Sequence, residues 1–441
     1  MTIKNQKLHD VLKEFSQAVA YLLIQKLTNI TPPVRVVKKI SIEGSGRASY
    51  YDQAEPDLGR FYITIEKEIL ALPQTTKALE ELQNDSSIAK HINQLIGFEG
   101  TGLFRLTADD CLRRFLFPML NEFNNLTWNE QIFEKYYLSF EDAFYSDVVQ
   151  YRSIAPLENF SGDFDEVDLG NGLKIIKADK KCLEEIWERG EFNPFIDRHN
   201  IWTVEYVIQL DYSVKKIIGE GNTTPIGSLV REQITDVVTA LRVFKPGMTG
   251  FNFIESVPLQ SSVLIPGIES VGGLSTQPYR WDKYSLTHKE TSQFAVFFKV
   301  YKEAKPSLPN YIIVAIKRLE YAYARLLPQD KLLDYMIAFE ALFLKGDEEQ
   351  ELSYRLSLRS AYFIGSTTEE RKSIFEFIKN AYRVRSKTVH GDRIQDGGAN
   401  KEFVQQIEDK LRESIKKILA NKLFQQSHKD FIKGLDDSIL G

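Results

Sequence analysis

The sequence is short of the residues that build disulfide frameworks and metal centres. Its two cysteines, Cys111 and Cys182, lie far apart and form neither a CxxC pair nor a ligand spacing. A disulfide scaffold or a structural zinc site is therefore not expected. The six histidines include no HExxH motif and no cluster with cysteine or aspartate. Any chemistry of this chain is predicted to need no metal and no other cofactor.

Long apolar runs and a strong excess of charge are also missing. The most hydrophobic runs, such as residues 294–301 (FAVFFKVY), have the length of a strand, whereas a membrane span needs about 20 apolar residues. The start, MTIKNQKLHDVLKEF, has no apolar core of signal-peptide length. We therefore expect a soluble cytoplasmic protein with no membrane partner. The net charge of −5 argues against nucleic-acid binding through bulk charge alone, and it leaves room for a local basic site.

The chain has 441 residues, which is too long for one compact core, so more than one domain is expected. Residues 1–304 mix helical and strand patterns and indicate an α+β region, with an internal boundary near 155–165. Residues 305–441 are predicted to be helical throughout. Short loops between helices of this length indicate an antiparallel bundle. The sequence thus predicts an α+β N-terminal region followed by an all-α helical bundle.

Within the first region, residues 1–30 are predicted to form a helix that Pro32-Pro33 ends. The β-branched and aromatic residues of 34–72 indicate strands on either side of the polar turn DQAEPDLG. The other expected elements are helices over 76–96 and 107–125, a hairpin over 165–178 that turns at Gly170-Asn171-Gly172, a strand over 202–212 and a short helix over 235–247.

The helices of the second region are delimited by capping and breaking residues. Asp330 is expected to cap the second helix and Gly346 to follow it, and Gly365 is expected to end the third. Ser366 and Glu369 form a capping-box pattern for the fourth. The predicted ranges are 309–327, 330–346, 348–364, 366–390 and 400–424, the last of these following Gly397-Gly398.

Successive helices of this region each carry a charge where an apolar residue is expected. These residues are Glu340, Arg359 and Arg385. The stripe around Arg385 consists of Ile374, Ile378, Tyr382 and Val389. A lone buried charge costs several kcal/mol, so each needs a partner or a watery cleft. We expect Glu340 to pair with Arg359 or Arg385, leaving the other guanidinium for a cleft or a partner subunit. The alternative is a purely structural ion pair that fixes helix register.

Basic residues gather around Arg385 in the run YRVRSKTVHGD. Arg383 and His390 fall together at the margin of the apolar stripe. The pattern of an arginine five residues before a histidine is common by chance, and a histidine near a helix C-terminus is often a solvated cap. Two other candidates are weaker: the glycine-rich run 219–227 lacks the Lys-Ser/Thr of a phosphate loop, and His199 lies in a predicted loop.

The runs DKLLDYMIAFEALFL, ELSYRLSLRSAYFIG and AYRVRSKTVHGD together resemble the HEPN superfamily, and within it the ApeA-like HEPN domains of bacterial defence proteins. The superfamily motif is an arginine, four to six residues of which the first is usually polar, and a histidine. Arg385, Ser386 and His390 match it. Glu340 and Arg359 also look like family features. The resemblance covers residues 305–425.

This resemblance implies a metal-independent endoribonuclease that works as a homodimer through its C-terminal bundle. Arg385 and His390 would be catalytic, and they would leave a 2′,3′-cyclic phosphate and a 5′-hydroxyl. Arg383, Ser386 and Lys387 would bind the substrate. Arg383 also allows a second alignment with His390, so the choice of catalytic arginine stays open. Glu340 and Arg359 would be supporting residues.

For residues 1–304 the resemblance is vaguer and points to the sensing or regulatory regions that accompany such bundles. The implied partners are RNA, either tRNA or other cellular RNA, and a phage-derived trigger for the N-terminal region. The implied setting is abortive anti-phage defence. The alternative is a non-catalytic bundle for dimerisation or nucleic-acid binding, joined to a ligand-sensing N-terminal region.

Overall fold

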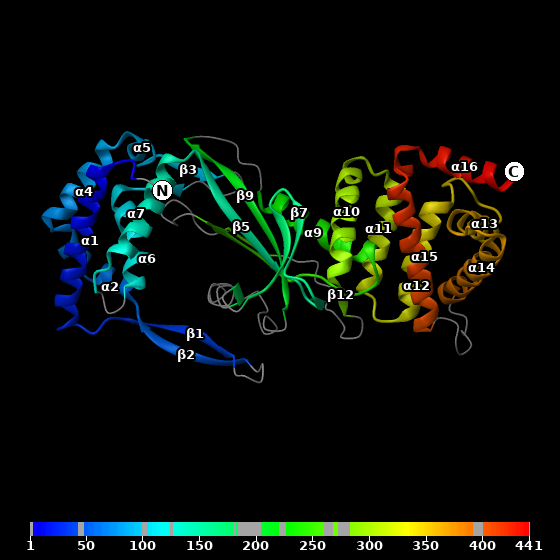
Figure 1. The fold of residues 1–441 in the computed structure, drawn as a ribbon, viewed down its shortest axis with the longest axis horizontal. Helices are drawn as coiled ribbons and strands as arrows, with labels where there is room; N and C mark the ends of the chain where they lie inside the picture. Colours follow the sequence, from blue (N-terminus) through cyan, green and yellow to red (C-terminus); the bar gives the residue numbers. More distant parts are fainter. Residues whose placement is uncertain are drawn as a thin grey trace.

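The computed structural model describes residues 3–42, 48–98, 104–123, 127–179, 182–183, 204–219, 226–259, 268–271, 283–390 and 400–440. The molecule is elongated, with helices at the N-terminal end, a β-sheet in the middle and helices again towards the C-terminus (Figure 1). The expected α+β N-terminal half and helical C-terminal region are confirmed. The division at residue 304 and the internal boundary near 155–165 stay predictions.

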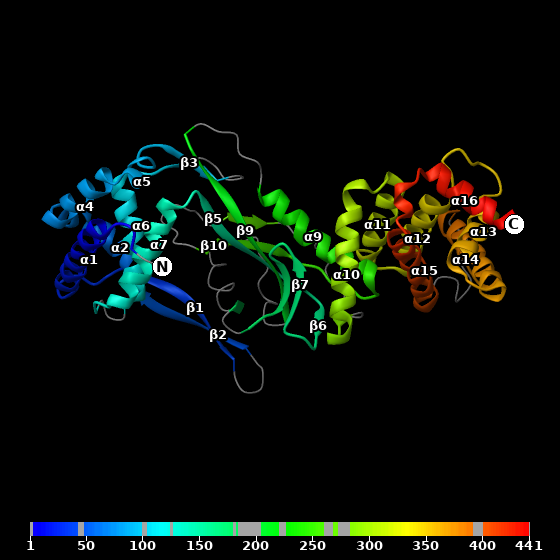
Figure 2. The ribbon, with the colours of Figure 1, turned by 45° about the horizontal axis from the view of Figure 1, so that its top comes forward.

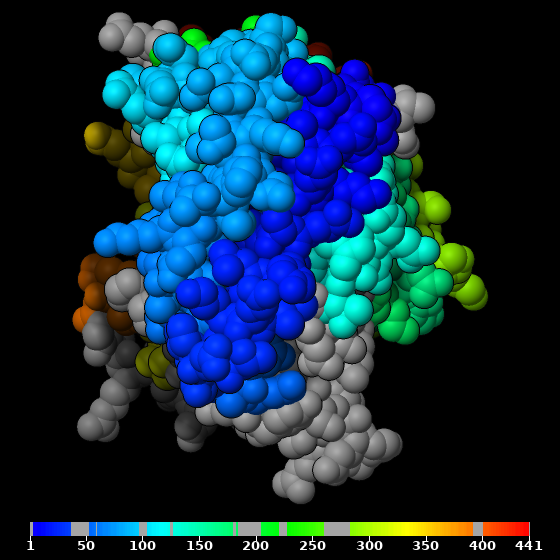
Figure 3. All heavy atoms as spheres, turned by 90° about the vertical axis from the view of Figure 1, so that its left-hand side faces the viewer, coloured from blue at the N-terminus to red at the C-terminus, as the bar shows by residue number. Residues whose placement is uncertain are grey.

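The helix predicted over residues 1–30 is confirmed as α1 (Gln6–Leu27). Asn5 caps it, because the Asn5 side chain accepts a hydrogen bond from the backbone N–H of Leu8 at 3.0 Å. Figure 3 looks onto this end of the molecule, where α1, in dark blue, lies beside the lighter blue residues that follow. The other helices here are α2 (Leu58–Thr64), α3 (Glu66–Leu70), α4 (Pro73–Asn84), α5 (Ser86–Ala89), α6 (Ala108–Glu122) and α7 (Glu130–Tyr145).

The strand predicted after the turn DQAEPDLG is wrong, because residues 60–70 are helical. Their β-branched and aromatic side chains favour a strand by composition. The buried residues Phe61, Ile65 and Ile69, however, recur at the spacing of one helix face. Asp57 also starts α2, because its carboxylate accepts a hydrogen bond from the backbone N–H of Arg60 at 2.9 Å. Tertiary burial and a cap therefore override local composition.

A two-stranded hairpin projects from the N-terminal helices (Figure 2). It pairs β1 (Val34–Ile42) with β2 (Ala48–Pro56) in antiparallel register. The second strand includes the residues DQAEP, which the sequence predicted as a turn. The polar character of these residues suits a hairpin that lies outside the main sheet.

The central sheet has eight strands, ordered β11–β10–β5–β9–β3–β4, and β8 pairs with β9 and in turn with β7. Its longest pairing is between β5 (Val148–Pro156) and β9 (Tyr206–Ile218), which run together away from the N-terminal helices (Figure 2). The remaining strands are β3 (Leu95–Phe98), β4 (Phe104–Arg105), β7 (Glu166–Gly170), β8 (Leu173–Lys177), β10 (Phe253–Pro258) and β11 (Ile268–Val271), and a separate parallel pair is formed by β6 (Phe160–Gly162) and β12 (Tyr284–Leu286).

The hairpin predicted over 165–178 is confirmed as β7 and β8. Gly170, Asn171 and Gly172 all have positive φ angles, of 86°, 53° and 77°. A Cβ atom at Gly172 would come within 2.2 Å of the carbonyl oxygen of Asp211. Glycine is therefore required at Gly172 both for its backbone angle and for the close approach of β9.

Two helices connect the sheet to the C-terminal bundle. The short helix predicted over 235–247 is part of the longer α9 (Ile226–Phe244). The apolar run 294–301 lies in α10 (His288–Ala304) and not in a strand. Both helices contact α15 (Lys401–Ala420) of the bundle. Buried apolar residues consequently continue without a break from α1 to the bundle.

Beyond residue 305 the described chain is helical apart from its connections, as predicted. Gly365 follows the third helix of the bundle at its C-cap, as expected. The second helix begins at Pro328, ahead of the predicted cap Asp330, and ends at Phe343, short of Gly346. A last helix lies beyond the five predicted ranges. The elements are α11 (Asn310–Tyr323), α12 (Pro328–Phe343), α13 (Leu352–Ile364), α14 (Thr368–His390), α15 and α16 (His428–Leu440).

The capping box at the start of α14 is present but shifted by one residue. The Thr367 hydroxyl accepts a hydrogen bond from the backbone N–H of Glu370 at 3.2 Å. The Glu370 carboxylate accepts in turn from the backbone N–H groups of Ser366 and Thr367, at 2.8 and 3.2 Å. Ser366 and Glu369, the predicted pair, are not the capping side chains. The helix is still fixed by the predicted type of contact.

Polar contacts from α15 hold the C-terminal end of α9. The Arg412 Nε donates to the carbonyl oxygen of Arg242 at 2.9 Å, and the Lys416 Nζ donates to that of Phe244 at 3.0 Å. The last carbonyl groups of a helix lack partners within the helix, so these cations satisfy them. The sheet-side helix α9 is therefore attached to the bundle by hydrogen bonds as well as by its apolar face.

Candidate functional site

Helix α14 carries most of the residues that the sequence singles out. Its buried face consists of Ile374, Ile378, Ala381 and Val384, which pack towards α12 and α13. Val389, predicted on the same stripe, is 55% exposed. The stripe therefore ends near Arg385, and the final turn of α14 extends beyond the apolar contact. Of the predicted catalytic pair, Arg385 thus lies at the end of the buried stripe and His390 lies beyond it.

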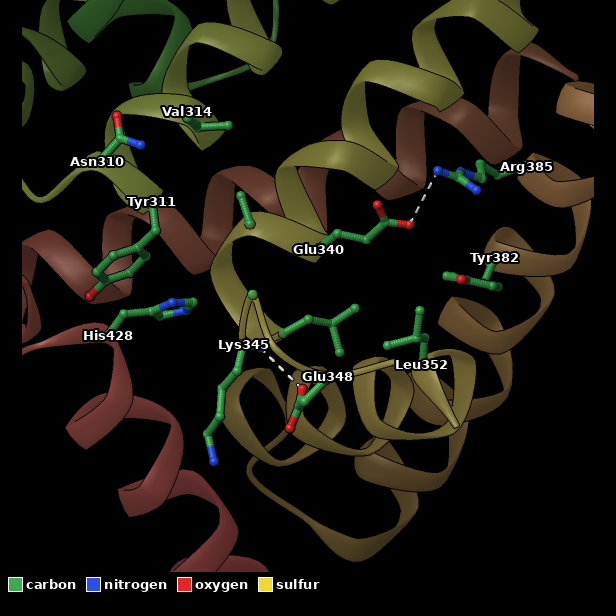
Figure 4. A pocket seen from close by; sticks show the side chains of 13 residues that line it. Asn310, Tyr311, Val314, Glu340, Lys345, Glu348, Leu352, Tyr382, Arg385 and His428 are labelled. Atoms are coloured by element: carbon green, nitrogen blue, oxygen red, sulfur yellow. Dashed lines mark hydrogen bonds and ion pairs between the residues drawn. The ribbon is translucent and has the colours of Figure 1, made fainter. Parts of the chain in front are cut away.

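Arg385 pairs with Glu340 of α12, which is one of the two pairings predicted. The Arg385 Nη2 lies 3.6 Å from the Glu340 Oε1 (Figure 4). Both side chains are about one quarter exposed, at 27% and 25%. Their separation exceeds the ordinary hydrogen-bond distance of about 3.2 Å. In the part of the chain that the structure describes, the buried Nε of Arg385 has no hydrogen-bond partner.

Burial and the neighbouring charge act in opposite directions on the Glu340 carboxyl. Burial raises the pKa of the Glu340 carboxyl above its ordinary value, although the positive charge of Arg385 opposes the change. Burial, together with the charge of Glu340, also raises the pKa of the Tyr382 hydroxyl. The pair is thus a cation and a carboxylate in a partly dry site, without the close hydrogen bonds that usually satisfy such groups.

Arg385 and Glu340 open onto a pocket of about 520 Å³ between α11, α12, α14 and α16. Figure 4 shows Glu340 in the middle, with Arg385 and Tyr382 to one side and Tyr311 with His428 to the other. The full lining is Asn310, Tyr311, Val314, Glu340, Ala341, Leu344, Lys345, Gly346, Glu348, Leu352, Tyr382, Arg385 and His428. The cavity is large enough for a small polar molecule or for part of a larger one.

Two aromatic rings form the far end of the pocket. Tyr311 and His428 stack with their centroids 4.2 Å apart. The His428 Nε2 donates to the carbonyl oxygen of Leu342 at 3.1 Å, since a carbonyl can only accept. Burial lowers the pKa of the His428 imidazole. Burial also raises the pKa of Tyr311 to about 12, and the Tyr311 hydroxyl has no partner within the described chain.

His390 does not line this pocket. It is the last residue of α14 and is exposed. Five residues of helix separate two side chains by about 7.5 Å along the axis and by about 140° around it. The structure therefore brings Glu340 and Arg385 together and leaves His390 on the outside of the same helix. Its imidazole is available there to a second molecule.

The remaining predicted residues of α14 lie on its outer surface or at its margin. Arg383 is exposed, and its Nη2 donates to the Asn380 side-chain oxygen at 2.8 Å. Lys387 is exposed, and Ser386 is half-buried. None of these three lines the pocket. They can only contact a substrate that extends over the outside of α14.

Arg359 is occupied elsewhere, so the expectation that the second guanidinium would be available is wrong. It is 3% exposed, and it donates to the Glu348 carboxylate at 2.8 Å and to the Asp436 carboxylate at 2.7 Å. It also donates to the carbonyl oxygen of Phe343 at 3.0 Å. Asp436 belongs to the unpredicted helix α16. Arg359 therefore ties α13 to the end of α12 and to α16, which is a structural role.

Sequence reasoning missed the aromatic end of the pocket because it missed α16. A signal was present: Ser427 and Asp430 have the spacing of a capping box. In the structure the Asp430 backbone N–H donates to the Ser427 hydroxyl at 3.1 Å, and this hydroxyl donates to the Asp430 carboxylate at 2.6 Å. His428 lies between them, so recognising the cap would have placed His428 at a helix start.

His199, the core of the glycine-rich run 219–227, Gly391 and Gly397-Gly398 lie outside the described residues. Within the described ranges, no group of His, Cys, Asp and Glu is arranged to hold a metal ion. The same ranges contain no helix with the length and apolar character of a membrane span. Comparisons with protein-family models, curated proteins and solved structures find no significant match to this chain.

Proposed function

We propose that the chain is a metal-independent endoribonuclease of the HEPN type, with Arg385 in its active site. The supporting observation is the Arg385 guanidinium, which lines a pocket. It lies 3.6 Å from the Glu340 carboxylate, beyond hydrogen-bond distance, and its buried Nε has no partner among the described residues. A planar guanidinium can bridge two non-bridging oxygens of a phosphate and stabilise the charge that grows in the transition state.

The proposed reaction is transesterification of RNA. A ribose 2′-oxygen attacks the adjacent phosphorus, the bond to the 5′-oxygen breaks, and a 2′,3′-cyclic phosphate and a 5′-hydroxyl result. Arg385 binds the phosphate, and His390 transfers a proton, because an imidazole titrates near neutral pH. Arg383, Ser386 and Lys387 contact the RNA that extends over the outside of α14. We propose a homodimer through the bundle, in which the exposed His390 meets substrate.

We further propose that residues 1–304 sense a phage-derived trigger and restrain the bundle, and that the substrate is tRNA or other cellular RNA in the cytoplasm. A nuclease acting on cellular RNA would harm its own cell, so control is needed. The hydrogen bonds from Arg412 and Lys416 to the end of α9 give a direct mechanical connection between the two halves. This supports regulation through the position of α9, in abortive anti-phage defence.

The test is a digest of total tRNA and of a mixed-sequence RNA in the presence of EDTA. The proteins compared are the wild type, Arg385→Ala and His390→Ala. Lys372→Ala serves as a matched control, since Lys372 is an exposed cation of the same helix. Circular dichroism confirms folding, and the 3′ ends of the products are mapped. We expect 2′,3′-cyclic phosphate ends from the wild type and the control, and none from the other two.

The position of His390 favours one alternative. Because His390 is exposed and does not line the pocket, the bundle can instead be a non-catalytic module for dimerisation or nucleic-acid binding, joined to a ligand-sensing N-terminal region. In that case Arg385→Ala lowers stability or RNA affinity, and His390→Ala changes nothing. Equal residual cleavage in all the proteins would remove the catalytic role of Arg385 and His390 and leave this alternative.

A further inference from the structure

The pair of Glu340 and Arg385 is incomplete in a way that other buried pairs of the bundle are not. The Arg359 Nη1 donates to Glu348 at 2.8 Å, and the Arg412 side chain is hydrogen-bonded to Glu408. Glu340, in contrast, accepts no hydrogen bond from any described residue, and its nearest cation stands at 3.6 Å. Unsatisfied donors and acceptors in a partly dry site cost free energy. A ligand that offers both an acceptor and a donor would satisfy them together.

RNA offers these two groups side by side. A phosphate presents acceptors to the N–H groups of Arg385, and the neighbouring ribose 2′-hydroxyl presents a donor to Glu340. The 2′-hydroxyl is the group that distinguishes RNA from DNA at a given site. The Arg385 Nη2 and the Glu340 Oε1 lie 3.6 Å apart, and both residues line the same pocket. Figure 4 shows both side chains directed into the same space.

We propose that Glu340 is the general base of this site and takes the proton of the ribose 2′-hydroxyl while Arg385 holds the adjacent phosphate. The inference rests on the proposed ribonuclease function and adds a catalytic residue to it. The 2′-oxygen forms its bond to phosphorus as the proton moves to the carboxylate, and the bond from phosphorus to the 5′-oxygen breaks. The leaving oxygen receives a proton from His390 or water, and Glu340 returns its proton to solvent.

Geometry favours Glu340 over His390 for the first proton transfer. Glu340 lines the pocket with Arg385, and His390 does not. A general base must lie within hydrogen-bond reach of the proton that it abstracts. A buried carboxylate with a raised pKa is also a stronger base than an ordinary one. This assignment leaves His390 free for the second proton transfer, at the outer end of α14.

Several titratable groups surround Glu340, and Arg385 is the charge that acts on its pKa. The titratable groups that line the pocket with it are Arg385 and Tyr382 on α14, Lys345 and Glu348 between α12 and α13, Tyr311 on α11 and His428 on α16. Lys345 lies 3.7 Å from Asp436, and Glu348 is bound to Arg359. Arg385 is the charge that opposes the effect of burial on the pKa of Glu340.

The first arm of the test measures single-turnover cleavage of a short RNA from pH 4 to 9. The variants are Glu340→Gln and Glu340→Asp, and the control is Glu376→Gln, because Glu376 is an exposed acid of α14. We expect Glu340→Gln to slow cleavage by about 10²-fold or more and to abolish the fall in rate at low pH. Glu340→Asp keeps that fall at a reduced rate, and the control behaves as the wild type.

The second arm does not depend on cleavage. The probes are the four ribonucleoside 3′-monophosphates and their 2′-deoxy counterparts, and binding is measured by calorimetry. We expect the wild type to prefer the ribonucleotides and Glu340→Met to bind both sets equally. A 13C NMR titration adds a spectroscopic check: Arg385→Gln should raise the pKa of Glu340 further, since the opposing charge is lost.

The outcomes separate the two proposals. If the wild type cleaves RNA and Glu340→Gln has the same rate with the same fall at low pH, Glu340 is not the base. The proposed ribonuclease function then still stands. No cleavage by wild type overturns both. Cleavage that loses its low-pH limb in Glu340→Gln and keeps it in Glu340→Asp and in the control Glu376→Gln establishes Glu340 as the base. Unfolding of Glu340→Gln is checked by circular dichroism, and Glu340→Asp then carries the comparison.

Discussion

Replacing Arg359 with methionine should lower the free energy of unfolding by about 3–5 kcal/mol, the usual effect of removing one partner from a buried ion pair. Its guanidinium donates to both oxygens of Glu348 at 2.8 Å and to those of Asp436 at 2.7 and 3.0 Å. Methionine keeps much of the side-chain volume but leaves the two carboxylates without this partner. The contact between α13 and α16 is therefore the first to weaken.

The pKa of Glu348 gives an independent measure of the same effect. Hydrogen bonds from Arg359 are the largest cause that lowers this pKa from 4.5 to about 2. A difference of that size corresponds to about 3 kcal/mol of stability at neutral pH. Because the folded pKa lies below the unfolded one, the contribution is fully present above about pH 4.5 and is lost as the pH falls towards 2.

The assay is urea denaturation of the wild type and Arg359→Met at pH 7 and again near pH 3. The difference in unfolding free energy should be large at pH 7 and smaller at the lower pH. Lys433→Met is the control: Lys433 is exposed on α16, so its loss should change stability by less than about 0.5 kcal/mol. A loss below about 1 kcal/mol for Arg359→Met at pH 7, or one independent of pH, would refute the reasoning.

Three other predictions follow from described contacts. Thr367→Ala should cost about 1 kcal/mol by removing the cap of α14, and Ser366→Ala, which removes no capping side chain, should cost much less; thermal unfolding distinguishes them. Burial lowers the pKa of Lys216 from 10.5 to about 8, so unfolding free energy should rise as the pH increases between these values, and Lys216→Met should abolish that slope in denaturant titrations. The buried His428 should titrate below 6.5 in an NMR pH series, and the stability that depends on its neutral form should be lost as the pH falls below 6.5 towards its folded pKa. Titration of His428 at or above 6.5 would contradict its burial.

The pairing of Glu340 with Arg385 could be predicted because charges on apolar helix faces need partners. The periodicity of α12 and α14 gives the faces on which these residues lie, and the cost of burying a lone charge implies the pair. Periodicity cannot say which of two arginines is chosen, because that depends on the third partner of each. Arg359 donates a hydrogen bond to Asp436, which lies on α16, a helix beyond the ranges predicted from the sequence.

The position of His390 could not be predicted from its spacing to Arg385. A helical pattern gives directions around an axis, but it does not say how far the neighbouring helices extend alongside. Val389, which periodicity places on the buried face, is 55% exposed in the structure. The same limit explains residues 60–70, where composition favours a strand but burial of Phe61, Ile65 and Ile69 selects a helix.

Strand β9 extends from the N-terminal helices towards the helices of the C-terminal half. Its 13 residues span about 43 Å at the usual rise of a strand. It pairs with β3 beside the N-terminal helices, with β5 along much of its length, and it packs against α9. Residues 206–210 of β9 are all buried, so both faces of this end of the strand are covered. Under the regulation proposed above, a disturbance of the N-terminal helices would reach the bundle through β9 and α9 as a change of angle, and in the proposed homodimer this change would alter the distance between the two pockets.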